Sequence, residues 1–88
     1  MDHLPLISLA AAWPSQVVVV VAVDVPNDDS ARLKALGICV GRKVQIVKRG
    51  DPLIVRVVGT RIGLSGRLAE SVQVRPVAGA SEVTSIAG

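Results

Sequence analysis

The sequence predicts one small, mainly β domain in which five short strands close into a barrel around an aliphatic core. Three observations support this fold class. The chain has 88 residues, which suffices for one hydrophobic core and is too short for two. Val and Ile supply 23 of these residues, and β-branched side chains favour strands. Turn-forming Gly and Pro residues separate the apolar segments, so the strands are expected to be short.

The first long strand is expected over residues 17–25, after a lead-in over residues 1–16 that packs on the barrel through leucines and Ile7. Five consecutive valines begin this strand. A continuous apolar run of this kind indicates a strand that is covered on both faces, or one with a face shielded by a partner or by the lead-in. Pro26 then ends the strand.

A short helix is expected over residues 28–36, between the first and second long strands. Asn27 or Asp28 is expected to cap its free N–H groups, and acidic residues in the first turn suit the positive end of the helix dipole. Gly37 is expected to end the helix in the left-handed conformation. The following residue, Ile38, would then pack back on the helix.

Four further strands complete the expected sheet: 42–48, 53–58, 61–64 and 71–75. Apolar and polar residues alternate within them, which is typical of a sheet with one face in the core. Gly59 and Thr60 are expected to form a two-residue hairpin turn. One helical turn, capped by Ser65, is expected before the last strand.

Five strands in about 60 residues are too few for a two-sheet sandwich, so the expected architecture is a small SH3-like barrel. We expect one domain over residues 1–76, with its core over 17–75, and a flexible C-terminal tail over 77–88. No apolar run reaches the ~20 residues that span a bilayer, and no Lys or Arg precedes Arg32. The sequence therefore predicts a cytoplasmic protein.

The composition argues against an enzyme. One Cys and one His exclude a disulfide framework and a zinc site built from four Cys or His ligands. No base and nucleophile stand at a recognisable catalytic spacing. Cys39 is interpreted as a small buried side chain, with a redox or metal thiol as the alternative. His3 is interpreted as solvated, with a metal ligand as the alternative.

No resident cofactor is expected. Asp28 and Asp29 are explained by the start of the helix, and together with Asp24 they leave a surface site for a divalent metal ion as an alternative. Trp13 is interpreted as packing the lead-in over one end of the barrel. Its alternative role is that of an anchor for a partner.

Basic residues are concentrated in the second half of the chain. The net charge is +3 for the whole chain and +6 for residues 41–75. Such a surplus suits an acidic partner, and the alternative is a solvated strand face. Ile54 and Val58 flank Arg56 on the outward side of one strand, as in an interaction patch, unless the helix or the tail covers them. The expected partner-binding residues are Arg42, Lys43, Ile54, Arg56, Val58 and Arg61.

Three segments resemble the ferrous iron transport protein A family: LKALGICVGRKV at 33–44, DPLIVRVVGTRIGL at 51–64 and LAESVQV at 68–74. The resemblance extends over residues 4–75. It departs from the family pattern at Ser15, where a Gly is usual, and at Cys39-Val40, where a hydrophobic residue and Pro are usual. The resemblance implies an SH3-like barrel similar to the C-terminal domain of iron-dependent repressors.

The resemblance also implies a function. It suggests a small cytoplasmic accessory or regulatory protein of bacterial ferrous iron uptake, held at the inner face of the membrane through its partner. The implied partner is the cytoplasmic GTPase part of the ferrous iron transporter, and the family is described as transition-metal-related. A homodimer stays open. The alternative is a nucleic-acid-binding barrel, but single-strand binders stack bases on aromatic side chains that this chain lacks, so no nucleic acid is expected.

Overall fold

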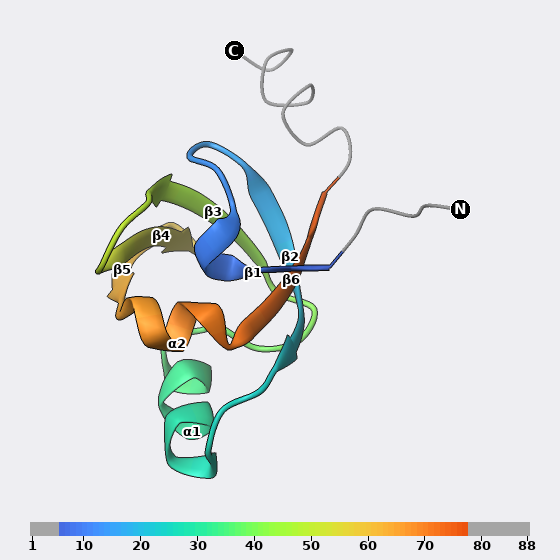
Figure 1. The fold of residues 1–88 in the computed structure, drawn as a ribbon, viewed down its shortest axis with the longest axis vertical. Helices are drawn as coiled ribbons and strands as arrows, with labels where there is room; N and C mark the ends of the chain where they lie inside the picture. Colours follow the sequence, from blue (N-terminus) through green and yellow to red (C-terminus); the bar gives the residue numbers. More distant parts are fainter. Residues whose placement is uncertain (1–5, 78–88) are drawn as a thin grey trace.

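Six strands form one antiparallel sheet in the computed structural model, which describes residues 6–77 (Figure 1). Across the sheet the order is β1-β6-β2-β3-β4-β5, so β1 and β5 are its edges. The strands are β1 (Ile7–Ser8), β2 (Val17–Val23), β3 (Lys43–Lys48), β4 (Leu53–Val57), β5 (Thr60–Leu64) and β6 (Val72–Pro76). The helices are η1 (Leu9–Ala11), α1 (Asn27–Ala35) and α2 (Gly66–Glu70). The predicted mainly β fold with a helix after the first long strand is confirmed, and β1 adds a sixth strand.

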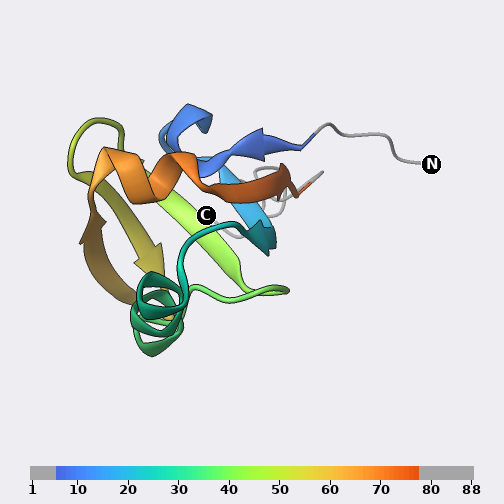
Figure 2. The ribbon, with the colours of Figure 1, turned by 60° about the horizontal axis from the view of Figure 1, so that its bottom comes forward.

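The sheet curves round on itself, with η1 and α2 over the side between its two edges (Figures 1 and 2). These two helices contact each other, and both contact β6. Leu9 of η1 and Ala69 of α2 are fully buried. Their side chains therefore fill space that the pairing of strands does not enclose.

The core consists of aliphatic side chains alone, and no polar or charged residue among residues 6–77 is buried. Alternation places the expected residues inward, as the pairs Val44 and Ile46 on β3 and Val72 and Val74 on β6 show. Burial of such side chains contributes about 1.5–3 kcal/mol each to folding. The core therefore stabilises the fold without holding any group that could do chemistry.

The valine run of β2 is only partly covered. Val18 and Val20 are buried, whereas Val17, Val19 and Val21 are half-buried on the outer face. Within residues 6–77 the strand is therefore fully covered on one face only, and shielding of the outer face by a partner stays a prediction. The strand also ends at Val23, two residues earlier than predicted.

Helix α1 ends as its sequence predicts. Gly37 has a φ of +97°, its N–H donates to the carbonyl of Lys34 (2.9 Å), and the Ile38 N–H donates to that of Leu33 (2.9 Å). Both Leu33 and Ile38 are fully buried, as this type of helix end favours. The start of the helix differs from the expectation.

The expected side-chain cap at the start of α1 is absent. The helix begins at Asn27, with Pro26 before it, and no side chain there accepts a capping hydrogen bond. Asp28 and Asp29 lie inside the first turn. There their carboxylates act through the helix dipole and not as caps.

The β4–β5 hairpin turns one residue earlier than expected. Val57 pairs with Thr60, so the two turn residues are Val58 and Gly59. Their φ angles are +50° and +79°, and two positive φ angles define a type I′ turn. The prediction of a Gly59-Thr60 turn was wrong because it placed the glycine first.

Helix α2 is capped from two directions. The Ser65 Oγ accepts a hydrogen bond from the Leu68 N–H (3.2 Å), as predicted. The Asp51 Oδ1, in the turn between β3 and β4, accepts one from the Gly66 N–H (2.9 Å). A Cβ on Gly66 would lie 3.3 Å from the Asp51 Cγ, so the glycine lets this turn approach the helix closely.

Some expectations fall outside the described residues. These are the expectations for His3 and for the tail beyond residue 77. Val77, the first residue of the expected tail, is described, and its N–H donates to the carbonyl of Val17 (3.0 Å). Among the helices of residues 6–77, none has the length and hydropathy needed to cross a membrane.

Candidate interaction surface

Every charged residue on the six strands is basic. These residues are all exposed: Lys43, Lys48, Arg56, Arg61 and Arg75. The acidic residues of the described chain lie instead in helices, turns and loops: Asp24, Asp28, Asp29, Asp51 and Glu70. The outer face of the sheet is therefore cationic without interspersed carboxylates.

Two arginines stand directly opposite each other on this face. Arg56 of β4 pairs with Arg61 of β5, and Gln45 of β3 pairs with Arg56 on its other side. Like charges in this position disfavour strand pairing. Neither guanidinium takes part in a side-chain hydrogen bond within residues 6–77. Both therefore have donors free for an anionic group.

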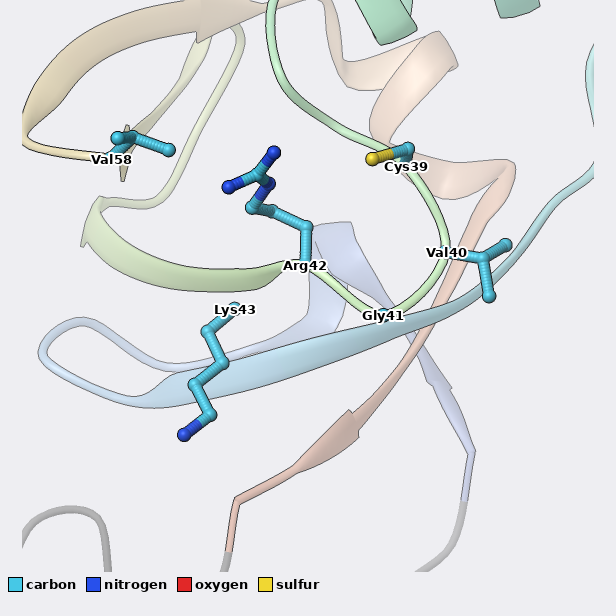
Figure 3. Close-up of a pocket in the computed structure, with 6 residues that line it drawn as sticks. All are labelled: Cys39, Val40, Gly41, Arg42, Lys43 and Val58. Carbon is cyan, nitrogen blue, oxygen red and sulfur yellow. The ribbon is translucent and has the colours of Figure 1, made fainter.

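An open hollow of about 620 Å³ lies at one end of the sheet (Figure 3). The connection between α1 and β3 and the tip of the β4–β5 hairpin form its walls. Its lining residues are Cys39, Val40, Gly41, Arg42, Lys43 and Val58. Val40 is 66% exposed and Val58 is 73% exposed, so two aliphatic side chains flank the hollow in water.

Backbone hydrogen bonds hold the connection in place. The Gly41 N–H donates to the Val20 carbonyl (2.8 Å), and the Val20 N–H donates to the Arg42 carbonyl (3.0 Å). The Arg42 Nε donates to the Gly37 carbonyl (3.2 Å), and its guanidinium points across the hollow toward Val58 (Figure 3). A cation is thus fixed beside exposed aliphatic side chains.

The structure brings most of the predicted partner-binding residues into one region. Arg42, Lys43 and Val58 line the hollow, and Arg56 and Arg61 follow on the strands that meet at the hairpin tip. The sixth residue, Ile54, is half-buried, and a Cβ on its cross-strand partner Gly63 would lie 3.4 Å from the Ile54 Cδ1. Whether these residues bind a partner stays a prediction.

Val40 was not among the predicted partner-binding residues, and Cys39 lies in a different environment from the one expected. Cys39 is half-buried at the hollow, with its Sγ 4.0 Å from the Gly37 carbonyl oxygen. The expectation of a buried thiol is wrong because Ile38 fills the buried position. The only signal was the placement of Cys39 and Val40 between two glycines, which is typical of a loop.

Trp13 does not pack over the end of the barrel as expected. Its ring is 66% exposed, and the Arg49 guanidinium carbon lies 4.6 Å from the ring centroid. This cation–π contact is worth about 0.5–1 kcal/mol at an exposed site. The ring is thus held on the surface, and the role of a partner anchor stays a prediction.

No group of three or more His, Cys, Asp or Glu residues within residues 6–77 could hold a metal ion. Asp28 and Asp29 with Asp24 do not form such a group. The chemistry that the described surface offers is the binding of anionic and apolar groups by arginine, lysine and valine side chains.

Comparisons with known proteins identify one matching family model and several similar structures. A family model described as the FeoA domain matches residues 7–76. The fold is similar to that of an iron uptake regulatory protein (FeoA), with a TM-score of 0.79, 24% identity, and coverage of 83% of this chain and 100% of that one. No match was found among curated protein sequences.

Two further structures extend the likeness. A Stenotrophomonas maltophilia FeoA complexed with zinc, described as a prokaryotic SH3 domain protein and as a candidate activating factor of ferrous iron transport, is 32% identical. Its TM-score is 0.68, with coverage of 77% of this chain and 88% of that one. T. acidophilum IdeR shares the fold at a TM-score of 0.77 and 18% identity, over 88% of this chain and 37% of that one. The predicted SH3-like fold is thereby confirmed.

Proposed function

The chain belongs to the FeoA domain family, whose members are associated with ferrous iron transport, and from this premise we propose that it is a cytoplasmic accessory protein of bacterial ferrous iron uptake. It acts by binding the cytoplasmic GTPase part of the membrane iron transporter, which holds it at the inner face of the membrane. The observation that supports this proposal is the hollow, where Val40 and Val58 lie exposed beside Arg42 and Lys43.

The chemistry of the hollow suits a protein face that is both acidic and apolar. Burial of Val40 and Val58 against a partner removes aliphatic surface from water. Arg42 keeps donors beyond its bond to Gly37, and a guanidinium already fixed in place loses little freedom when it meets a carboxylate. Lys43 adds charge that speeds the encounter more than it strengthens the complex.

The direct test measures binding of the purified chain to the purified cytoplasmic part of the transporter from the same organism, by calorimetry. Truncation of an exposed apolar anchor and loss of a charged hydrogen bond each weaken binding by about tenfold or more, so Val58→Ser and Arg42→Gln are expected to do so. Arg67→Gln is the control, because Arg67 is also an exposed arginine but lies on α2, outside the hollow.

Two results would contradict the proposal. One is the absence of binding by the unaltered chain, and the other is equal weakening by Arg42→Gln and Arg67→Gln, which indicates only a diffuse charge effect. Ferrous iron uptake by cells that carry each variant in place of the natural gene links the affinity to function. Variants that lose binding are expected to lose uptake.

A nucleic-acid-binding barrel is the second candidate function, and the all-basic strands favour it. Against it, Trp13 is the only aromatic residue of the chain. This function predicts retardation of RNA or DNA in a gel, with an affinity that falls steeply as the salt concentration rises. A lack of retardation at low salt excludes it.

A further inference from the structure

Strand β5 is an edge of the sheet with one neighbour, β4. Within residues 6–77, no backbone hydrogen bond joins residues 60–64 to any other element. An edge of this kind is a template on which another extended chain can pair.

The hairpin register identifies the outward-facing backbone groups. Residues that flank a two-residue turn exchange both backbone hydrogen bonds, and the bonded pairs then alternate along the strands. Val57 and Thr60 are therefore bonded, while the pairs that contain Arg61 and Gly63 are not. The N–H and C=O groups of Arg61 and Gly63 therefore point away from β4, outward from the edge of the sheet, and both residues are exposed.

The opposite edge does not offer the same surface. Strand β1 has only two residues, and a very short edge strand is one way in which proteins prevent further pairing. Strand β5 has five residues and follows the exposed tip at Val58. A segment that pairs with β5 would thus lie beside this edge, extending from the hollow next to the cationic outer face.

The positive charge beside this edge favours an acidic segment as the binding partner over a second copy of the chain. Arg61 at the edge stands opposite Arg56, and none of the six strands of residues 6–77 carries an acidic residue. Two copies that paired through β5 would bring four of these arginines together, and like charges across strands are unfavourable. An extended segment with an Asp or Glu side chain on the same face as Arg61 gives the opposite result, because its carboxylate meets two guanidinium groups.

We propose that β5 binds an extended, acidic segment of the protein partner by strand addition, with Arg61 and Gly63 forming the backbone hydrogen bonds and the Arg56–Arg61 pair holding the carboxylate. This inference rests on the proposed function, since the segment belongs to the cytoplasmic part of the transporter. Backbone pairing supplies the affinity of such a contact, and the side chains supply its selectivity.

Gly63 allows a test that changes the edge without changing its charge. A Cβ there would meet the Ile54 Cδ1 at 3.4 Å and the Pro52 Cβ at 3.5 Å, and Gly63 is not among the glycines with positive φ. Gly63→Pro removes the outward N–H, and proline is accepted on edge strands. Gly63→Ala adds the same Cβ and keeps the donor, so it is the matched control.

Loss of one backbone hydrogen bond at the edge is expected to weaken binding of the cytoplasmic part of the transporter by about tenfold in Gly63→Pro and little in Gly63→Ala. Circular dichroism of both variants checks that they fold. Should Gly63→Pro fail to fold, hydrogen exchange on the unaltered chain replaces it. The Arg61 and Gly63 amides are expected to exchange about tenfold more slowly in the complex, while a docking contact without strand addition leaves them unchanged.

The charged part of the inference is tested with Arg61→Gln against Arg67→Gln. Arg61→Gln is expected to weaken binding by about tenfold and to reduce its salt dependence, because a charge-assisted hydrogen bond is lost. If the unaltered chain does not bind, the proposed function fails. If it binds, but the Gly63→Pro and Gly63→Ala variants have the same affinity and the Arg61 and Gly63 amides are not protected in the complex, only this inference fails. Amide protection that rises with concentration of the chain alone, indicating self-pairing, also overturns it.

Discussion

The two loops that form the hollow reach left-handed backbone conformations with different residues. The connection between α1 and β3 uses Gly37 (φ +97°) and Gly41 (φ +90°), whereas the hairpin tip places Val58 (φ +50°) before Gly59 (φ +79°). A β-branched residue in this region is strained. In the connection, the glycines allow Ile38 to enter the core, so packing explains the geometry.

At the hairpin tip, packing does not explain the residue. Val58 is 73% exposed, so no buried contact compensates for its conformation. Strain of this kind clusters at binding and catalytic sites. Core packing therefore accounts for the backbone of the connection, whereas the proposed contact with a partner would account for the valine at the tip, and substitutions in the two loops should differ accordingly.

The largest effect is expected from Ile38→Ala. Ile38 is fully buried, and its truncation leaves a cavity that lowers the free energy of unfolding by about 3 kcal/mol. Urea denaturation followed by circular dichroism measures this loss. Val40→Ala, in the same connection but exposed, serves as the control and should change the free energy by less than about 0.5 kcal/mol. Equal losses would show that the connection does not contribute to the core as described.

The next effect is expected from Gly37→Ala. An alanine there is strained by its φ, and its Cβ would lie 3.0 Å from the Val57 Cγ1, so the expected loss is about 2 kcal/mol. At Gly41 a Cβ meets nothing within 4 Å, so Gly41→Ala has only the backbone strain, at about 1 kcal/mol. Thermal unfolding of both variants separates the two contributions. A larger loss for Gly41→Ala would contradict this account.

The hairpin tip should respond in the opposite direction. Val58→Asn creates an Asn-Gly turn, the favoured sequence for type I′, and is expected to raise the free energy of unfolding by about 1 kcal/mol. The same change removes an exposed aliphatic side chain from the hollow, so binding of the transporter part should weaken. Denaturation and calorimetry on one preparation measure both effects. A destabilised variant, or one that binds as before, would break the distinction between the two loops.

The smallest effect is expected at Ser15, a second exposed residue that is not glycine and has positive φ (+72°). Its N–H donates to the Ile46 carbonyl (2.7 Å), and Ser15→Gly keeps this bond while it relieves strain. Glycine also adds entropy to the unfolded chain, which offsets part of the relieved strain. We therefore expect a net gain of only about 0.5 kcal/mol in the free energy of unfolding, measured by thermal unfolding. Ser30→Gly, inside α1, is the control and should lose about 0.5–1 kcal/mol.

The sequence was sufficient where a local rule decides the structure. Alternation predicted which face of β3 and β6 is buried, and the glycine after α1 predicted both its end and the burial of Ile38. The hairpin register could not be predicted in this way, because a valine is a poor choice for a left-handed position. A turn at Gly59-Thr60 would have placed Arg61 opposite Val58, so the Arg56–Arg61 pair follows only from the observed register.

The candidate site was predictable in its residue types and not in its shape. The basic residues and Val58 were identified from the sequence, whereas Val40 and Cys39 reach the hollow through tertiary contacts that fix the connection against β2. Trp13 shows the same limit. The sequence could not reveal that its ring would meet Arg49 and not the core.

The position of Trp13 has a consequence for spectroscopy. With no Phe or Tyr in the chain, the near-ultraviolet absorption and emission arise from a single indole. That indole lies on the surface beside Arg49, in the turn whose Ser15 N–H is bonded to Ile46. Tryptophan emission therefore reports the opening of this one turn, and far-ultraviolet dichroism reports the whole sheet. Followed together during denaturation, the two signals distinguish local opening near the amino-terminal turn from global unfolding.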